Sequence, residues 1–301
     1  MRAIAIGRKS VKITNSIVNN AVLVIVVVLI AFAGYALWDS NQIHLAADKS
    51  NYAVYKPNVE DEGRSFKELQ ALNNEIFAWL TVYGTNIDYP VTQGPDNMKY
   101  VNTNAEGQYS LSGSIFLDSA NSKNFSDFNS ILYGHHMAKK VMFGEIGDFA
   151  DREMFETHRY ANLYYDEKDH GIEFFAFLHT DAYNASVFRA NTKEEGRQAY
   201  LDGLFDKSMY TRDIGVTIHD SIILLSTCSS YSTNGRDILI GRITDELYED
   251  SATTKTSDDM LGAVKQNRLA QKIPLWIVFL AITLVALPAT LIFNMIYKRV
   301  K

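Results

Sequence analysis

Two long apolar segments, one near each end of the 301-residue chain, constrain its fold more than any other feature. The first runs from about Ile17 to Trp38 and the second from about Ile273 to Tyr297. Each has at least the roughly 20 residues that a helix needs to cross a bilayer. If both cross the membrane, residues 39–272 lie together on one side of it.

A cleaved signal peptide is the alternative interpretation of the first segment. Its apolar core, however, is longer than the roughly 7–15 residues usual in signal peptides. The small residues at its end, Gly34-Tyr35-Ala36, form a poor cleavage site. We therefore expect an uncleaved anchor.

Basic residues at the two ends predict the orientation of the spans, because basic residues next to a span stay in the cytoplasm. Both ends are then cytoplasmic, and residues 39–272 lie outside the cell membrane. Removing these seven charges from the net charge of −6 leaves −13 on the rest of the chain, which argues against nucleic-acid binding. The basic residues are Arg2, Arg8, Lys9, Lys12, Lys298, Arg299 and Lys301.

The remaining sequence predicts one folded domain with linkers on both sides. We expect a basic tail at 1–16, a transmembrane helix at 17–38, a stalk and linker at 39–63, an extracellular domain at 64–250, a connector at 251–272, a second transmembrane helix at 273–297 and a basic tail at 298–301. Within the domain, many short strands and few helices predict a mostly-β barrel with inserted helices. Strands are expected at 79–82, 87–91, 112–117, 130–133, 159–165, 171–180, 221–227 and 237–244, and helices after Ser65, at 146–155 and at 192–210.

The stretch from Ser221 to Arg242 contains the only cysteine of the chain. A buried apolar strand ends at Cys228, a turn-rich segment follows, and a second strand begins at Arg236. If these strands are neighbours, the two side chains meet at one edge of the sheet, where a cation favours the reactive thiolate. An inert buried cysteine beside a surface arginine is the alternative. A single cysteine also excludes an internal disulfide framework.

A thiol that cleaves an acyl bond needs a partner that moves protons. Among the seven histidines, His135 follows an apolar strand and a glycine, so it stands at a strand end as Cys228 does. A loop histidine bonded to the backbone is the alternative. The other histidines are expected in the stalk (His44), on the surface (His158, His170 and His219), in a structural position (His179) or beside His135 (His136).

Several short motifs resemble those of sortases. The order of strand, Ser-Thr-Cys, loop and strand-initial Arg resembles the sortase signature, although Leu224 replaces its first Thr. Class B sortases are similar in three further places, which follow in family order: GTNIDYPV at 84–91, GSIFLD at 113–118, and YGHHM at 133–137 with MFG at 142–144. The resemblance runs from about Phe66 to Arg242 and implies a sortase-type β-barrel.

The resemblance also implies roles by position. Cys228 would be the nucleophile that attacks the carbonyl of the Thr in a sorting signal, His135 would move the proton of the leaving and incoming amines, and Arg236 would hold the oxyanion. Asp118 either orients His135 or sits in a turn, and His136 is expected to point away from the thiol. Substrate-binding positions are Ser226, Asn97, Val101 and Tyr133, for which ordinary packing is the alternative.

The implied enzyme is a membrane-anchored cysteine transpeptidase that cleaves after Thr through a thioacyl intermediate and passes the acyl group to an amine. Neither a metal nor an organic cofactor is implied. Its partners would be a surface protein or pilin bearing a sorting signal, and an amine acceptor, either a pilin lysine or a cell-wall precursor. The second span favours pilin polymerisation. A hydrolytic cysteine peptidase and a non-enzymatic membrane-anchored adhesin or sensor domain are the alternatives outside the family.

Overall fold

The computed structural model describes residues 2–57, 65–229 and 233–250. The predicted connector, second transmembrane helix and C-terminal tail therefore lie outside the described residues. The chain divides into two units, residues 1–42 with 269–301, and residues 43–268. Each unit is considered by itself.

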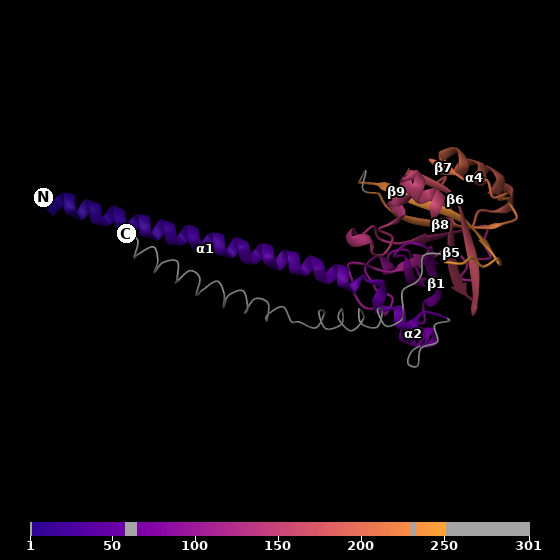
Figure 1. Cartoon of the computed structure of the whole chain (residues 1–301), viewed down its shortest axis with the longest axis horizontal. Coiled ribbons are helices and arrows are strands. Elements are labelled where there is room, and N and C mark those ends of the chain that lie inside the picture. Colours follow the sequence, from indigo (N-terminus) through magenta and orange to yellow (C-terminus); the bar gives the residue numbers. More distant parts are fainter. Residues whose placement is uncertain (1, 58–64, 230–232, 251–301) are drawn as a thin grey trace. The chain divides into compact units, whose positions relative to one another are not determined.

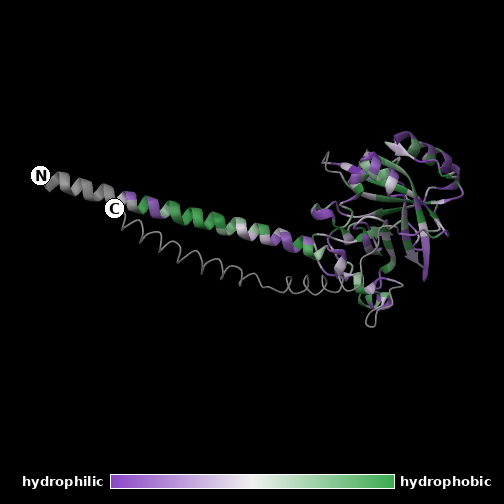
Figure 2. Cartoon of the chain, viewed as in Figure 1, coloured by the Kyte–Doolittle hydropathy of each residue, from purple (hydrophilic) through white to green (hydrophobic). Residues whose placement is uncertain are grey.

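The first unit contains most of helix α1 (Arg2–Ala46). The segment Ile17–Ala46 of this helix, in which the mean hydropathy reaches 2.7 over 18 residues, is long and apolar enough to cross a membrane, and Figure 2 shows its apolar band. The predicted span at 17–38 lies within this helix, but the helix does not end at Trp38. No glycine or proline interrupts residues 39–46, so the first part of the predicted stalk continues the helix.

The second unit is built on a closed barrel of eight strands in the order β5-β1-β2-β3-β4-β8-β9-β6, completed by pairing between β5 and β6 (Figure 1). The predicted barrel and its eight strands are thus confirmed within the described residues, with shifted ends. A two-residue strand, β7, pairs with β6 and is too short for a sequence pattern to predict. The bounds are β1 Ile76–Val82, β2 Asp88–Thr92, β3 Ile115–Leu117, β4 Asn129–Tyr133, β5 Tyr160–Tyr165, β6 Lys168–Asp181, β7 Tyr210–Thr211, β8 Ser221–Cys228 and β9 Gly235–Thr244.

Short helices lie between the strands. The helix predicted at 146–155 is divided at Asp151, because the Asp151 carboxylate caps a new helix by accepting hydrogen bonds from its second and third amide groups, those of Glu153 and Met154. The bounds are η1 Lys49–Asn51, η2 Ala53–Tyr55, α2 Phe66–Leu72, η3 Lys99–Val101, η4 Ala138–Lys140, η5 Ile146–Ala150, α3 Arg152–Thr157 and α4 Glu194–Lys207, where η denotes a 3₁₀ helix.

Two apolar layers hold this unit together, because side chains of a strand alternate between its two faces. On β8, Ile223 and Leu225 point into the barrel, whereas Ile222 and Leu224 point outward. The outward layer is covered by one face of α4, through Tyr200, Leu201 and Leu204. Both faces of β8 are therefore buried along most of its length, which explains its continuous apolar run.

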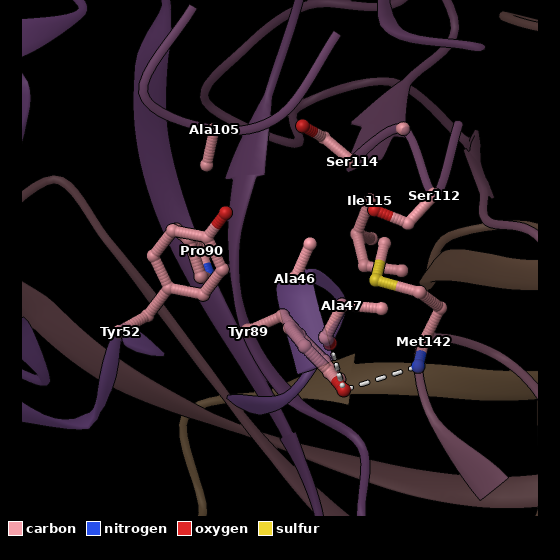
Figure 3. A pocket seen from close by; sticks show the side chains of 11 residues that line it. Ala46, Ala47, Tyr52, Tyr89, Pro90, Ala105, Ser112, Ser114, Ile115 and Met142 are labelled. Carbon is pink, nitrogen blue, oxygen red and sulfur yellow. Dashed lines mark hydrogen bonds between the residues drawn. The ribbon is translucent and has the colours of Figure 1, made fainter. Parts of the chain in front are cut away.

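One buried hydroxyl joins three separate segments of the barrel unit. Tyr89 on β2 donates a hydrogen bond to the Ala47 carbonyl at 3.0 Å and accepts one from the Met142 amide at 3.0 Å (Figure 3). Burial raises the pKa of Tyr89, so the hydroxyl keeps its proton for the first bond. The residues after α1 and the loop after β4 are thus held by the same oxygen.

We expect Tyr89→Phe to lower the free energy of unfolding by about 1–3 kcal/mol, because it leaves the buried Met142 amide and the Ala47 carbonyl unpaired. Tyr109→Phe is the matched control, since Tyr109 is 78% exposed and its change should stay within about 0.5 kcal/mol. Denaturant unfolding of the chain in detergent measures both. Equal stability of the two variants would contradict the bridging role of Tyr89.

Candidate active site

The ends of β8 and β9 bring the cysteine and the arginine together. Cys228 and Arg236 are directly opposite partners in the antiparallel ladder of these strands. Cys228 is exposed and Arg236 is half-buried, so the interpretation of Cys228 as an inert buried residue is wrong. Opposite residues of an antiparallel pair project from the same face, so thiol and guanidinium share one surface.

The parallel neighbour of β8 carries His135 to the same edge. In the β4–β8 ladder Tyr133 is the partner of Ser226, and the Gly134 amide donates to the Ser226 carbonyl at 3.1 Å. A Cβ on Gly134 would lie 2.6 Å from a side-chain atom of Ile115 in the barrel core. Position 134 therefore faces inward, and by alternation His135 faces outward, as Cys228 does.

A hydrogen bond to the backbone fixes the His135 ring. Its Nε2 lies 2.8 Å from the carbonyl oxygen of Val101. A carbonyl only accepts, so Nε2 carries a proton and Nδ1 is the atom that can exchange one. The backbone bonding expected of a loop histidine is thus present, and it also orients the ring at the edge shared with the thiol.

The segment after His135 folds back tightly. His136 is exposed and pairs with Met142 in an isolated β-bridge, and the Phe143 amide donates to the His135 carbonyl at 3.1 Å. The turn requires positive φ angles at three residues that are not glycine: Lys139 (59°), Lys140 (57°) and Met142 (55°). Such angles are strained for residues with a Cβ and are often found at functional sites.

Asp118 organises the surface beside β4. Its Oδ2 accepts hydrogen bonds from the Tyr133 hydroxyl and from Asn97 Nδ2, both at 2.9 Å. Asn97 Oδ1 in turn accepts the Ser119 amide at 2.7 Å. Of the two predicted roles of Asp118, the turn role is confirmed, because its Oδ1 accepts the Ala120 amide and its carbonyl accepts the Asn121 amide, both at 2.9 Å. Through Oδ2 Asp118 also orients Asn97 and Tyr133, a role that the sequence did not predict.

Two aromatic residues that sequence reasoning missed flank Tyr133. The ring centroids of Phe116 and Phe188 lie 5.3 Å and 6.4 Å from that of Tyr133. Ser226, the ladder partner of Tyr133, is 1% exposed, and its hydroxyl has no hydrogen-bond partner among the described residues. The predicted substrate-binding residues Asn97, Val101, Tyr133 and Ser226 thus lie around one region, which with Phe116 and Phe188 we call the Tyr133 surface.

The inner face of the same sheet edge holds a hydrogen-bonded histidine and carboxylate. His179 Nδ1 donates to the buried Asp237 carboxylate at 2.5 Å, from positions that are ladder partners on β6 and β9. His179 thus has the structural role that we expected, because it is hydrogen-bonded to a buried carboxylate. His170, expected on the surface, instead stacks against Tyr165 with a centroid distance of 3.9 Å and a mostly buried side chain.

The site brings a thiol, an imidazole and a guanidinium to one face at one edge of the sheet. No group of three His, Cys, Asp or Glu residues within the described parts of the chain could hold a metal ion. The cavity lined by Tyr52, Tyr89 and Met142 (Figure 3) has a volume of about 10 Å³, room for about one water molecule. A thiol beside an imidazole and a guanidinium is a set of groups suited to acyl transfer through a thioester.

Comparison with known proteins decides the family. No protein-family model matches the chain. Sortase B of Listeria monocytogenes is 33% identical over 192 residues, which cover 62% of this chain and 77% of the relative. The chain belongs to the class B sortases.

Solved structures of class B sortases agree with this assignment. Sortase B from the type II pilus of Streptococcus pneumoniae is 45% identical, with a TM-score of 0.54, and the match covers 60% of this chain and 99% of that one. A Streptococcus pyogenes class B sortase involved in pilus biogenesis is 40% identical, with a TM-score of 0.56, and the match covers 61% of this chain and 100% of that one. The resemblance inferred from the motifs is confirmed, and the protein is a sortase cysteine transpeptidase. An adhesin or sensor without enzymatic activity is thereby excluded.

Asp118 also controls the ionisation of Tyr133 in this sortase. Burial raises the pKa of Tyr133, and the charge and hydrogen bond of Asp118 raise it further, while Arg236 opposes them. We expect Asp118→Asn to lower the pKa of Tyr133, because a neighbouring anion disfavours the phenolate, and burial to keep it above its ordinary value. Titration of ring-labelled tyrosine by NMR measures this change. Asp202→Asn, an exposed change on α4, is the control, and an unchanged pKa in Asp118→Asn would contradict the proposed coupling.

Proposed function

We propose that this sortase is a membrane-anchored transpeptidase that cleaves a C-terminal sorting signal after Thr and transfers the acyl group to an amine. Cys228 is the nucleophile, His135 the acid and base, and Arg236 the oxyanion partner. One observation carries the proposal: the registers of β4, β8 and β9 direct all three side chains to one face at one edge of the sheet.

In the first half-reaction the Cys228 thiolate attacks the carbonyl carbon of Thr. Arg236, its ladder partner, donates to the oxygen as it becomes an oxyanion, which stabilises the transition state electrostatically. His135 then donates the proton that the leaving amine needs, through Nδ1, because Nε2 donates to the Val101 carbonyl. The bond between carbon and nitrogen breaks and leaves a thioacyl-enzyme.

The sorting signal binds against the Tyr133 surface in this proposal. That surface is next to the thiol on the β4 side, and its polar side chains are held in place by Asp118. Val101 lies against His135 through its carbonyl. Ser226 lies beneath, and its unpaired hydroxyl would gain a partner if a peptide group reached it.

The acceptor is proposed to be a pilin lysine, with a cell-wall precursor as the second candidate. Support comes from the similarity to two sortases associated with pili, at 45% and 40% identity. Hydrolysis without transfer is the enzymatic alternative. Adding an amine separates the two, because a transferase makes an amide product whose yield rises with amine concentration, whereas a hydrolase releases only acid.

The proposed anchor is the apolar segment of α1, with the domain outside and both termini in the cytoplasm. Tags at each end should be inaccessible to protease added to intact cells, and a tag placed in the α4 region should be cleaved. The expectation rests on the basic residues at the two ends. Digestion of a C-terminal tag from outside would refute the second span.

Fluorescent peptides with Thr at the cleavage position test the catalytic assignment. Cys228→Ala should form no thioacyl-enzyme and no product, and His135→Ala should lose activity by about 100-fold or more, as expected for loss of a general acid–base group. His136→Ala is the matched control and should lose little, since His136 is exposed in the turn. An inactive His136→Ala with an active His135→Ala would show that the proton carrier is misassigned.

Arg236 is expected to act without exchanging protons, because its guanidinium stays charged. Arg236→Ala should lower kcat/KM by roughly 100- to 1,000-fold, the usual effect of removing one oxyanion donor. Arg236→Lys should recover little activity, because a point charge does not reproduce the planar donor fork. Steady-state kinetics on one peptide measures both variants, and near-normal activity of Arg236→Ala would mean that another group stabilises the oxyanion.

A further inference from the structure

A second hollow lies beside Arg236, on the side away from the Tyr133 surface. It has a volume of about 690 Å³, within the range of small-molecule sites, and it opens to solvent. Its walls come from the end of β6, from β7, from η5 and from the strand ends next to the thiol. Residues lining it include His179, Asp181, Met209, Tyr210, Ser229 and Arg236.

The order of strands places this pocket and the Tyr133 surface on opposite sides of the thiol. Across the sheet the order is β4, β8, β9, β6 and β7. Tyr133 is on β4, Cys228 on β8, Arg236 on β9, and Thr180, the ladder partner of Arg236, on β6. Arg236 also lines this pocket, so the pocket reaches the β9 side of the thiol, opposite the side of the Tyr133 surface.

The second half-reaction reverses the geometry of the first. The leaving amine departs from the side of the carbonyl that faces away from the bound signal, and by microscopic reversibility the acceptor amine enters from there. We propose that the pocket beside Arg236 receives the primary-amine acceptor as a lysine side chain with its flanking backbone. This inference rests on the proposed function and adds to it the place where the second substrate binds.

The chemistry of the walls suits a lysine. Asp181 is exposed at the rim, and its Oδ1 accepts the Tyr183 amide at 2.8 Å, so the carboxylate is held while its charge faces solvent. This charge attracts an ammonium group arriving from solution. Met209, which is 48% exposed, and Tyr210 offer apolar surface to the methylene groups of the side chain. His179, fixed by Asp237, forms a rigid wall.

The transfer step balances as follows. The lone pair of the neutral amine forms a bond to the thioester carbonyl carbon, and the bond between carbon and sulfur breaks with its electrons returning to Cys228 as thiolate. The proton lost by nitrogen goes to His135 Nδ1. The products are an amide and the free enzyme, and no oxidant, reductant or metal is required. Arg236 in the pocket wall favours the neutral form of an amine next to it, which is the nucleophilic form.

Two variants of the full-length chain in detergent test the pocket. Asp181→Asn removes the charge but keeps an oxygen that can accept the Tyr183 amide, and Met209→Trp narrows the pocket. Asp202→Asn, an exposed charge removal on α4, is the control. The acceptor probes are Nα-acetyl-lysine methylamide, which needs the pocket, and hydroxylamine, which is small enough to reach the thioester without it.

We expect all three variants to form the thioacyl-enzyme and release it to hydroxylamine at the wild-type rate. Transfer to the lysine probe should fall roughly tenfold in Met209→Trp. For Asp181→Asn, the loss of transfer to the lysine probe relative to wild type should be largest at low ionic strength, because salt then screens the charge of Asp181 least. Wild-type use of the lysine probe by both pocket variants would overturn the assignment, as would loss of thioacyl formation in the folded variants, which would mean that the pocket serves the first substrate.

If the proposed function itself is wrong, the wild-type chain gives different results from those that would overturn the pocket assignment alone. A wild-type chain that forms no thioacyl-enzyme, or one that forms it and yields only acid with every amine, would overturn the transpeptidase assignment and the pocket assignment with it. A wild-type chain that uses hydroxylamine but not the lysine probe would overturn the pocket assignment alone. Thermal unfolding of each variant confirms that it folds, and the two pocket variants are independent of each other.

Discussion

The hydrogen-bonded register of β4, β8 and β9 is the constraint on which the active edge depends. Pairing of Tyr133 with Ser226 and of Cys228 with Arg236 sets the positions of the imidazole, the thiol and the guanidinium. A slip of one residue would turn one of them into the barrel, because the side-chain period of a strand is two. Apolar residues on both faces pin this register: Leu225 and Leu239 inside, and Leu224 and Ile240 under α4.

Two buried carboxylates near the active edge add a second constraint. Asp118 is 8% exposed and Asp237 is 1% exposed. A buried charge is tolerated only with hydrogen-bond partners, so the groups that satisfy it are held in place. Asp118 holds Asn97 and Tyr133, and Asp237 holds His179. The walls on the two sides of the thiol are thus fixed by the need to neutralise these charges.

Most strands and the meeting of His135, Cys228 and Arg236 at one sheet edge could be predicted from the sequence, because β4 and β8 are continuous apolar runs that end at polar residues. The partners of Asp118 and the pairing of His179 with Asp237 could not be predicted. These contacts join residues 15 to 58 positions apart and depend on ladder registers that no local pattern contains. The inward-facing residues of β6 could not be predicted either, because a bulge between Phe174 and Ala176 changes which side chains face inward.

The left-handed residues after His135 have a consequence for the thermodynamics of the enzyme. Lys139, Lys140 and Met142 each hold a conformation that costs a residue with a Cβ about 1–2 kcal/mol. Glycine would adopt it without that cost, but it would also give the unfolded chain more freedom and the folded turn more conformations. The chain therefore gives up some enthalpy at this turn and gains a narrow ensemble for the histidine ahead of it. In this sortase, a fixed position for the His135 ring and maximal stability are competing properties of the same few residues.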